Sequence, residues 1–388
     1  RVISKITTGS TPPTAQKEYF DGEIPWFTPG DIGVTANLSI SSRHISEIAI
    51  RHGKAKLLNT DTLLLTCIGD IGRVGVLQVQ SSCNQQITAL EFGKEVDPWF
   101  AYFWFVVNQP HVAAFANQAV VPILNNARLQ EIVFSYPPLA EQQRIAGLLR
   151  RADRLRRLRR YALEVGAGYL QAVFVAMFGE LTANPLGWTF NALGEVADIA
   201  SGVTKGRDFK GKATITTPYL RVANVQDGFL DLSEIKMIEA LPSDVEQLRL
   251  VHGDVVMTEG GDFDKLGRGA IWEGHVANCI HQNHIFRVRL NRDAVLPRYF
   301  VAFLLSPFAK QYFLRASKQT TNLATINMTQ LKALPVPLPP MAVQQKFVDV
   351  AEQHQRLRRQ QEEALRQAEH LFQALLRRAF AGAGGNDF

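Results

Sequence analysis

The sequence PPLAEQQRIA at residues 137–146 begins the segment that decides the fold of this chain. It opens a long proline-free run, rich in Arg, Glu, Gln, Leu and Ala, that extends to residue 178. The same pattern returns as PPMAVQQKFV at residues 339–348 and extends to residue 380. A Pro-Pro pair suits the first turn of a helix and disfavours helix in the residue before it. The two segments therefore predict two long helices.

Apolar or small side chains recur every three or four residues along both predicted helices. A narrow stripe sustained over several heptads is typical of a coiled-coil seam. At about 1.5 Å per residue, each helix would span roughly 60 Å. The alternative is a helix buried inside one large domain, and the repetition argues against it. The stripe residues are Ile145, Leu148, Ala152, Leu155, Leu158, Ala162, Val165, Tyr169, Ala172 and Ala176 in the first helix, and Phe347, Val350, Leu357, Ala364, Ala368, Leu371 and Leu375 in the second.

The composition is that of a globular protein. The chain has 388 residues, 46% hydrophobic and 20% charged, which is enough for two or three domains with real cores. Its three cysteines lie far apart without CxxC spacing, so they indicate neither a disulfide framework nor a zinc site. No run of eighteen apolar residues is present. We expect a soluble protein of the reducing cytoplasm, with no membrane partner.

The positive charge is concentrated in the first predicted helix. Residues 144–160 hold eight arginines against Asp153 alone, a net charge of +7, whereas the whole chain carries +6. The rest of the chain therefore sums to −1. This density favours a partner that carries phosphates or a carboxylate-rich helix, and the alternative is a solvated helix face.

The segments between the predicted helices read as short strands and loops, which indicates an α/β (α+β) fold. Residues 98–117 form one helical patch whose crowded aromatic side chains favour a core over a base-stacking surface. We predict two globular domains, each followed by a long helix, with boundaries at 1–138, 139–182, 183–340 and 341–388.

Residues 183–338 repeat the plan of residues 1–136. The sequence around Gly9 matches that around Gly202 at an offset of 193, and Asp61 matches Asp254 at the same offset. The Gly72-Arg73 pair matches residues 267–268 at 195, Gln85 matches Gln282 at 197, and the Pro-Pro pairs match at 202. The offset grows in small steps, so the copies differ by short loop insertions.

The chain shows no convincing catalytic or metal-binding motif. Residues 206–213 approach a phosphate-binding GxxxxGK[ST] loop, but Ala213 stands where a hydroxyl is required, and a strand-like segment follows. Glu234 and Lys236 have the spacing of some nucleases without a supporting carboxylate context. The His281/His284 pair reads as loop or core. We predict no catalytic and no metal-ligating residue.

Glycine-rich loops with polar tips recur at matched places, at residues 66–73 and 258–268. Backbone that approaches a phosphate needs glycine, and a neighbouring cation can reach a phosphate or a guanine edge. A hairpin turn explains each loop equally well when it is taken alone. The candidate DNA contacts are Thr66, Asp70, Arg73, Gln85, Lys205, Arg207, Lys210, Lys212, Lys265, Arg268, Lys318 and Gln319.

Several of these motifs together resemble the specificity subunit of type I restriction-modification systems. They are the run at residues 137–146 with its second copy from 339, TGSTP at 8–12, GDIGR at 69–73 and NQQ at 84–86. The resemblance covers nearly the whole chain in two tandem copies.

The resemblance implies that each globular unit is a target recognition domain that reads one half of a split, double-stranded DNA sequence. It further implies that the two helices pack as an antiparallel coiled coil, which sets the spacer and docks two modification (methyltransferase) subunits. Restriction subunits would join the full complex. S-adenosylmethionine, ATP and magnesium are then expected on those partners, and no cofactor on this chain. The expected docking residues are Gln142, Gln143, Arg150, Arg154, Arg157, Gln344, Gln345 and Arg358.

Two other functions remain open from the residues. One is a stand-alone DNA nuclease that uses Glu234 and Lys236, and the other is a structural adaptor with non-DNA partners.

Overall fold

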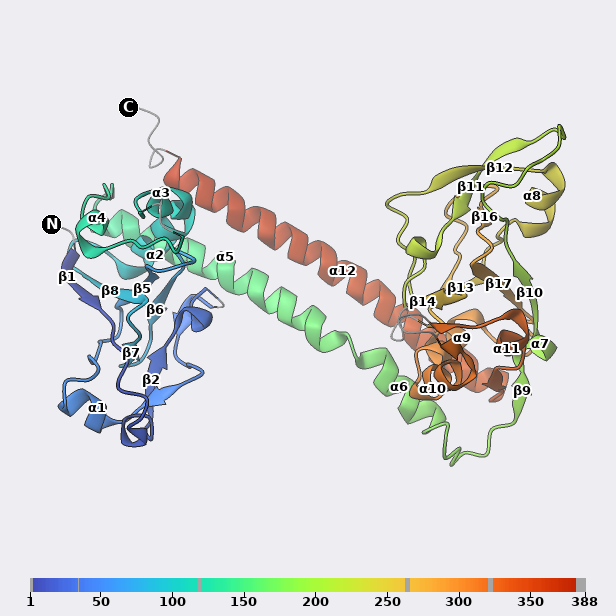
Figure 1. Cartoon of the computed structure of the whole chain (residues 1–388), viewed down its shortest axis with the longest axis horizontal. Coiled ribbons are helices and arrows are strands. Elements are labelled where there is room, and N and C mark those ends of the chain that lie inside the picture. The colour runs from blue at the N-terminus through green and yellow to red at the C-terminus, as the bar shows by residue number, and fades with distance from the viewer. Residues whose placement is uncertain (1–2, 34, 118–119, 262–265, 320–323, 382–388) are drawn as a thin grey trace. The chain divides into compact units, whose positions relative to one another are not determined.

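A computed structural model of the chain describes residues 3–33, 35–117, 120–261, 266–319 and 324–381. The chain forms two compact units (Figure 1). Unit 1 comprises Arg1–Tyr161 and Glu363–Phe388, and unit 2 comprises Ala162–Glu362. Each unit combines a globular body with parts of both long helices. The exact domain boundaries stay predictions.

Unit 1 is built on a five-stranded sheet in the order β1-β8-β5-β6-β3. Alternate side chains of a strand point to opposite faces. Leu63 and Leu65 accordingly pack in the core that contains helix α2 (Pro98–Val107), whereas Leu64 packs with Phe27 on the other face. Both faces are therefore covered. The strands are β1 (Ile3–Thr8), β8 (Ile87–Phe92), β5 (Leu63–Thr66), β6 (Val74–Leu77) and β3 (Asn37–Leu38).

Helix α2 supplies the aromatic core of unit 1. Asp97 caps it by accepting hydrogen bonds from the amides of Trp99 and Phe100, and Pro98 occupies the first helical position. The core assignment is confirmed, because five of its aromatic side chains are buried: Trp99, Phe100, Phe103, Trp104 and Phe105.

The remaining elements of unit 1 are short. A three-stranded sheet has the order β4-β2-β7. Its strands and the short helices are β4 (His44–Ile45), β2 (Ile24–Phe27), β7 (Ser82–Cys83), η1 (Lys17–Tyr19), η2 (Pro29–Asp31), α1 (Glu47–Arg51), α3 (Gln109–Ala114) and α4 (Asn126–Leu129).

Unit 2 repeats this architecture with a four-stranded sheet in the order β10-β17-β13-β15 and three smaller sheets, β12-β11-β16, β14-β19-β18 and β20-β9. Helix α9 (Pro297–Leu304) takes the place of α2 beside the sheet. The strands are β9 (Phe190–Ala192), β10 (Ala197–Ser201), β11 (Ile215–Leu220), β12 (Lys236–Ala240), β13 (Val255–Thr258), β14 (Gly260–Gly261), β15 (Gly269–Ile271), β16 (Ile280–His281), β17 (Ile285–Leu290), β18 (Lys318–Gln319), β19 (Ala324–Thr325) and β20 (Pro335–Pro337). The other helices are α7 (Leu193–Val196), η3 (Val222–Asn224), α8 (Pro242–Leu248), α10 (Pro307–Ala316) and α11 (Met328–Lys332).

Strand register confirms the duplication and corrects two of the sequence matches by one residue. Ile6 pairs with Leu90 and Ile199 with Val288, which gives offsets of 193 and 198. The Asn84 amide donates to the Phe27 carbonyl and the Gln282 amide to the Leu220 carbonyl, both at 3.0 Å. Gln282 is thus the counterpart of Asn84 and not of Gln85. Likewise Leu63 corresponds to Val255, so Asp254 lies at the place of Thr62 and not of Asp61.

The long helices begin where the sequence predicts. Helix α5 (Leu139–Gly166) follows the first Pro-Pro pair and α12 (Met341–Phe380) follows the second. The first helix is not continuous to residue 178, because α5 ends at Gly166 and a separate helix, α6 (Tyr169–Phe178), begins after Gly168. Glycine costs about 1 kcal/mol relative to alanine inside a helix, so two of them in three residues explain the interruption.

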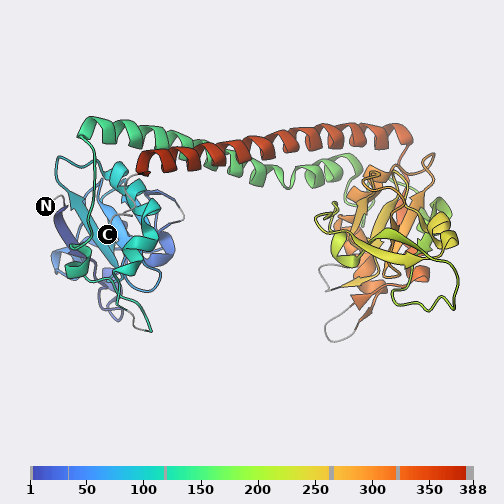
Figure 2. The same cartoon turned by 90° about the horizontal axis from the view of Figure 1, so that it is seen from above.

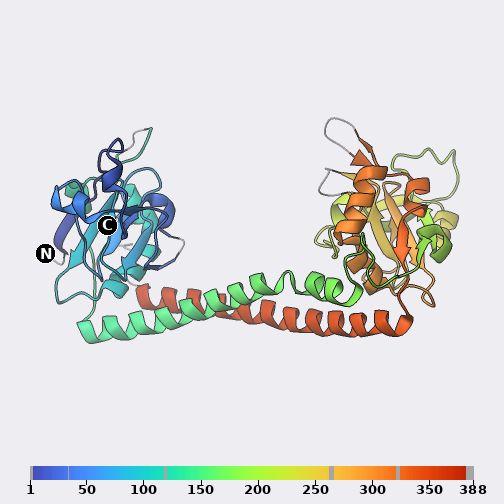
Figure 3. The ribbon, with the colours of Figure 1, turned by 90° about the horizontal axis from the view of Figure 1, so that it is seen from below.

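Within each unit, α12 packs against a segment of the first helical pair. In unit 1, the end of α12 lies beside the start of α5 (Figure 2), and its residues Phe372, Leu376 and Phe380 share a core with α5. In unit 2, the start of α12 lies beside α6 (Figure 3), and Phe347 packs edge-on against Phe174 with ring centroids 5.6 Å apart. The predicted seam is not buried through its middle, since Leu155, Leu158, Val165, Leu357 and Leu371 are 40–62% exposed.

All three cysteines are free and buried, as expected from their spacing. By length and composition, one stretch of the described chain, Leu139–Phe178, is long and apolar enough to cross a membrane. This is weak evidence for a membrane span, because helices of soluble proteins meet the same criteria.

Candidate nucleic-acid interface

Three loops that lie far apart in the sequence converge at one edge of the unit 1 sheet. The Gly9 amide donates to the Ile87 carbonyl at 3.0 Å, and the Ser10 amide donates to the Cys83 carbonyl at 2.9 Å. From the loop after β5, the Cys67 amide donates to the Gln86 carbonyl at 2.8 Å. The motifs TGSTP, GDIGR and NQQ are therefore brought together by tertiary structure. We call this set of loops, residues 8–12, 66–73 and 83–87, the loop edge of unit 1.

Unit 2 forms the same edge with the counterparts of two of these backbone bonds. The Val203 amide donates to the His281 carbonyl at 2.9 Å, and the Glu259 amide to the His284 carbonyl at 3.0 Å. The loop edge of unit 2 consists of residues 201–205, 258–268 and 281–285, of which 262–265 lie outside the described residues.

Glycine is required where the first loop crosses the third. A Cβ atom on Gly9 would collide with the carbonyl oxygens of Cys83 and Asn84, and one on Gly202 would collide with that of His281. These contacts involve backbone, which cannot move aside as a flexible side chain can. The glycine in the middle of the TGS and SGV sequences is therefore explained by close packing.

The densest exposed positive charge at either edge lies on the loop that continues from Val203 to β11. It carries Lys205, Arg207, Lys210 and Lys212, all exposed, against Asp208 alone. Arg207 forms an ion pair with Asp244 at 3.1 Å, whereas the three lysine side chains make no ion pair with any described residue. The structure therefore brings together four of the predicted DNA contacts, and three of them are free to bind phosphate.

The two predicted arginines of the glycine-rich loops form hydrogen bonds and ion pairs with other residues of their own units. The Arg73 guanidinium donates to the Pro29 carbonyl and lies 3.3 Å from Asp70. Arg268 donates to the Gln226 side chain at 2.8 Å. Both arginines are only partly exposed, so their first role is to hold neighbouring loops together.

Thr66 lies below the surface. It is fully buried, and its hydroxyl donates to the Asp70 carbonyl at 2.6 Å and accepts from the Arg73 amide at 3.0 Å. This side chain closes the turn and is not available to DNA, which corrects its assignment as a contact. Asp70 is exposed but shares its charge with Arg73.

Of the remaining predicted contacts, Gln85 is exposed at the loop edge and accepts a hydrogen bond from the Thr11 hydroxyl. Lys318 and Gln319 belong to strand β18, which pairs with β19. The orientation of their side chains, and all of Lys265, lie outside the described residues.

Two cations at the unit 1 edge were missed by sequence reasoning. The Lys56 ammonium donates to the Thr8 carbonyl at 3.3 Å, and the Lys54 carbonyl accepts from the Ser10 hydroxyl at 2.9 Å. Both lysine side chains are exposed. The basic run RHGKAK at residues 51–56 was the available signal.

The glutamine pairs that recur at the two helix starts each divide into one buried and one exposed residue. Gln142 is fully buried: its amide donates to the Glu95 and Pro137 carbonyls at 2.9 and 2.8 Å, and its oxygen accepts from the Asp97 amide at 2.9 Å. Gln344 is equally buried, with the equivalent contacts to Ala294, Pro339 and Leu296. Neither can reach a partner, which corrects their assignment as docking residues. Gln143 and Gln345 are exposed.

Most of the helix arginines also have partners inside unit 1. Arg150 lies over the Trp99 ring at 4.1 Å, and Arg157 pairs with the buried Asp153 at 2.9 Å. Arg144, Arg156 and Arg160 are paired with Glu141, Asp153 and Glu369. Among the predicted docking arginines of α5, Arg150 and Arg154 are exposed without an ion pair to a described residue, and Arg154 also makes no ring contact with one. Arg358 on α12 is exposed and pairs with Glu362 at 3.0 Å.

No group of three or more His, Cys, Asp or Glu side chains in the described part of the chain could hold a metal ion. Glu234 is engaged by Arg221 at 2.8 Å and by Lys236 at 3.4 Å, which leaves the proposed nuclease pair as a surface ion cluster. The loop at residues 206–213 leads into strand β11, not into a helix.

His281 is buried within the unit 2 edge, at the place that Cys83 occupies in unit 1. Its Nδ1 donates to the Ile285 carbonyl at 2.9 Å, and its Nε2 has no partner. Burial, together with the nearby charge of Arg287, lowers the pKa of His281 to about 4. The ring is therefore neutral at neutral pH and has a structural role.

This burial predicts that unit 2 loses stability in mild acid. In the unfolded chain a histidine binds a proton near pH 6.5, but folded His281 does so only near 4, so acidification below about 6.5 favours unfolding. The expected loss is on the order of 2 kcal/mol at pH 5. Urea unfolding of the full chain at pH 7 and pH 5, with His281→Cys as the comparison, measures it. Equal acid sensitivity of the two proteins would show that the buried, neutral His281 is not the cause of the loss of stability.

The chain consists of two tandem α/β units, and each unit presents the same loop edge beside a long helix. This arrangement defines a protein of tandem recognition domains. A family model described as the type I restriction modification DNA specificity domain matches residues 3–164 and 185–367. The chain belongs to this family. It is a specificity subunit of a type I restriction-modification system, and it recognises DNA sequence.

Curated relatives of the chain are also type I specificity subunits. The chain is 24% identical over 364 residues to the type I restriction enzyme MjaIX specificity subunit of Methanocaldococcus jannaschii, covering 89% of this chain and 83% of that protein. It is 28% identical over 263 residues to the EcoKI specificity subunit of Escherichia coli, covering 63% and 56%. These names do not support the nuclease or adaptor alternatives.

A solved structure shares the fold. The S subunit of a type I restriction-modification system from M. genitalium superposes with a TM-score of 0.60 at 16% identity, covering 98% of this chain and 95% of that one. The tandem arrangement of two mixed α/β domains with long helices is therefore that of known S subunits.

Proposed function

We propose that unit 1 and unit 2 each read one half of a bipartite DNA target through their loop edges. The observation that carries this proposal is the duplication of the edge itself: the same three loops meet through two equivalent backbone bonds in both units. Loops held rigidly by a sheet edge can present side chains to base edges in a fixed geometry. The loops differ in sequence between the units, so the two half-sites differ.

Affinity comes mainly from exposed cations beside the edges. Lys54 and Lys56 flank the edge of unit 1, and Lys205, Lys210 and Lys212 flank that of unit 2. Such residues neutralise phosphates and position the protein without reading sequence. Base reading then belongs to the edge loops, with Gln85 as the exposed candidate in unit 1.

The long helices form an antiparallel coiled coil that separates the two readers and docks two modification subunits. The packing of α12 against α5 in unit 1, and against α6 in unit 2, supports opposite chain directions. Exposed Gln143, Arg150, Arg154, Gln345 and Arg358 are the docking residues that burial leaves available. The methyl donor, ATP and magnesium act on the partner subunits, and the chain itself has no catalytic role.

Lengthening both helices by one heptad should lengthen the unread spacer of the target. Seven residues add about 10 Å to a helix, which corresponds to roughly three base pairs. The insertions belong between residues 148 and 163 in α5 and between 357 and 371 in α12. Mapping methylated adenines in a host that expresses the variant with its modification subunit measures the spacer.

Insertion in α5 alone is the control, because mismatched helices cannot pair in register and should abolish methylation. A spacer that stays unchanged in the doubly lengthened protein would show that the helices do not set the distance.

A further inference from the structure

Residues 117–123 form a further loop beside the loop edge of unit 1, between helices α3 and α4. Residues 118 and 119 of this loop lie outside the described residues. The ends of the loop are hydrogen-bonded to each other: the Asn117 amide donates to the Ile123 carbonyl at 3.1 Å, and the Ile123 amide donates to the Asn117 side chain at 2.7 Å. We call it the fourth loop of unit 1.

Backbone hydrogen bonds join the fourth loop to the glycine-rich loop at residues 66–73. The Gly69 amide donates to the Pro122 carbonyl at 3.1 Å, and the Leu124 amide donates to the Cys67 carbonyl at 2.9 Å. The fourth loop therefore belongs to the surface that the loop edge presents, and its position follows that of the glycine-rich loop.

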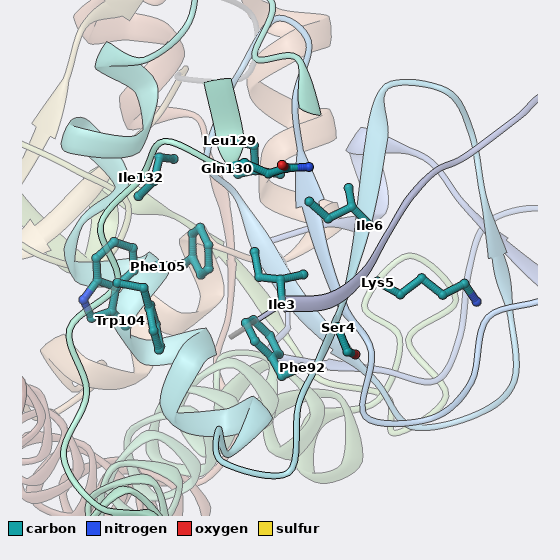
Figure 4. Close-up of a pocket in the computed structure, with 11 residues that line it drawn as sticks. Ile3, Ser4, Lys5, Ile6, Phe92, Trp104, Phe105, Leu129, Gln130 and Ile132 are labelled. Atoms are coloured by element: carbon teal, nitrogen blue, oxygen red, sulfur yellow. The ribbon is translucent and has the colours of Figure 1, made fainter. Parts of the chain in front are cut away.

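The segment that follows the fourth loop is fixed to the body of unit 1. The Asn126 side-chain amide, at the start of α4, donates to the Thr8 hydroxyl at 3.1 Å, and Thr8 belongs to the loop edge. At the end of α4, Leu129 packs in the core of the unit with Ile3 and Ile6 of β1 (Figure 4). A loop anchored at these points presents its tip in a defined place, which lowers the entropy lost when the tip binds.

The tip of the fourth loop is apolar and faces solvent. Val120 is fully exposed, and Val121 beside it is 52% exposed. Pro122 restricts the backbone of Val121, because the residue before a proline disfavours helix. Residues 117–123 contain no charged side chain, so this tip is not built to neutralise phosphate. Single exposed valines are common on protein surfaces, but these two are adjacent and lie on a recognition edge.

Unit 2 has a loop at the same place. The Ile326 amide donates to the Glu259 carbonyl at 2.8 Å, which is the counterpart of the bond from Leu124 to Cys67. Helices α4 and α11 follow the two loops, and each has an asparagine N-cap at an offset of 202. The two loops therefore correspond residue by residue at this offset.

The tips of the two loops differ in chemistry. At the offset of 202, residues 118–121 (QAVV) of unit 1 correspond to residues 320–323 (TTNL) of unit 2, and Val120 corresponds to Asn322. Residues 320–323 lie outside the described residues, so the difference is known from the sequence. Asparagine and threonine side chains form hydrogen bonds with base edges, whereas valine cannot. The two tips are therefore suited to different base features.

We propose that Val120 contacts the methyl group of a thymine in the half-site that unit 1 reads. This role rests on the proposed function of the loop edges, and it names a base feature that one of them recognises. In the major groove, the C5 methyl group of thymine is an apolar feature that small apolar side chains contact. Packing Val120 against this methyl group removes apolar surface of both from water. The contact adds specificity for thymine, and it adds nothing to the salt-dependent binding of phosphates.

Deoxyuridine tests the contact, because it is thymidine without the C5 methyl group. The target is first mapped by methylation, and each thymine on both strands is then replaced in turn by deoxyuridine. At one thymine, the complex with the modification subunit is expected to bind about fourfold more weakly, the effect of one buried methyl group. The complex that carries Val120→Asn should bind the thymine and deoxyuridine duplexes equally. The methylation map of this variant should also accept other bases at that position alone.

Val133→Asn is the matched control, because Val133 is 79% exposed in the segment that leads into α5 and lies outside the fourth loop. It makes the same change of side chain on the surface of the same unit, and it should keep the preference for thymine. Both valines are exposed, so both variants should unfold at the same urea concentration as the unchanged chain.

A complex that prefers its mapped target to unrelated DNA but is insensitive to deoxyuridine at every thymine would overturn the inference and leave the role of the loop edges intact. Retention of the thymine preference by Val120→Asn would overturn it as well. So would a smaller DNA bend with Val120→Asn that is the same on thymine and deoxyuridine duplexes, since the tip would then be a wedge between base pairs in the minor groove. A complex without any preference for its target would overturn both this contact and the proposed function.

Discussion

Gln142→Ala is expected to destabilise unit 1 by about 2–4 kcal/mol. The substitution removes three hydrogen bonds, so the Asp97 amide and the Glu95 and Pro137 carbonyls lose the partner that the buried Gln142 side chain supplies. Each such group costs about 1–3 kcal/mol when it is left unsatisfied. Asp97 is also the N-cap of α2, so the loss reaches the helix that carries the aromatic core. Native-state hydrogen exchange in α2 measures the change.

The adjacent Gln143→Ala is the matched control, and it should change stability by less than about 0.5 kcal/mol because this side chain is exposed. The reciprocal experiment uses unit 2, where Gln344 takes the place of Gln142. Gln344→Ala should weaken α9, whose N-cap Leu296 donates its amide to Gln344, and should leave α2 unaffected. Equal effects of Gln142→Ala and Gln143→Ala would show that the buried contacts do not stabilise the fold.

Replacing Lys205, Lys210 and Lys212 together by alanine is expected to weaken DNA binding by about 10- to 100-fold near 0.1 M salt. Their side chains are exposed on one loop beside the unit 2 edge and are not neutralised by a described carboxylate. Each lost phosphate contact lowers the slope of log affinity against log salt by about 0.9, so the slope should fall by roughly 2–3. The loss should be similar for cognate and unrelated DNA, because phosphate contacts carry no sequence information.

The matched control removes the same charge elsewhere in unit 2, by changing Lys346, Arg356 and Arg359 of α12, none of which is a proposed docking residue, to alanine. These residues are exposed on the long helix and not at the loop edge. If both triple variants lost affinity and salt dependence alike, net charge alone would account for binding, and the loop would have no special role. Binding of the assembled complex to labelled duplexes at several salt concentrations separates these outcomes.

The starts of the long helices were predictable because their signals are local. A Pro-Pro pair followed by good helix formers indicates a helix start without any knowledge of the rest of the fold, and α5 and α12 begin at Leu139 and Met341 as expected. The duplication was equally visible, since small loop insertions leave the order of motifs intact. The interruption after Gly166 could have been inferred from the two glycines in three residues.

The loop edges were only partly predictable. Sequence reasoning found the three motifs but not that they meet, because hydrogen bonds such as that from Cys67 to Gln86 join strands that are distant along the chain. It selected cations by residue type, and so could not distinguish Lys210, which is free, from Arg268, which is bound to Gln226 and half-buried.

The sequence by itself determined that this protein is a tandem pair of α/β recognition domains with long helices and belongs to the type I specificity family, because repeats, helix starts and motifs are properties of neighbouring residues. Only the tertiary structure decided which polar side chains are buried and hydrogen-bonded inside a unit and which face solvent. Gln142 and Gln143 are identical and adjacent, and at about 100° per residue along a helix they point in different directions. The first glutamine is buried and bonded to Glu95 and Asp97 of the loop between β8 and α2, whereas the second is exposed to solvent.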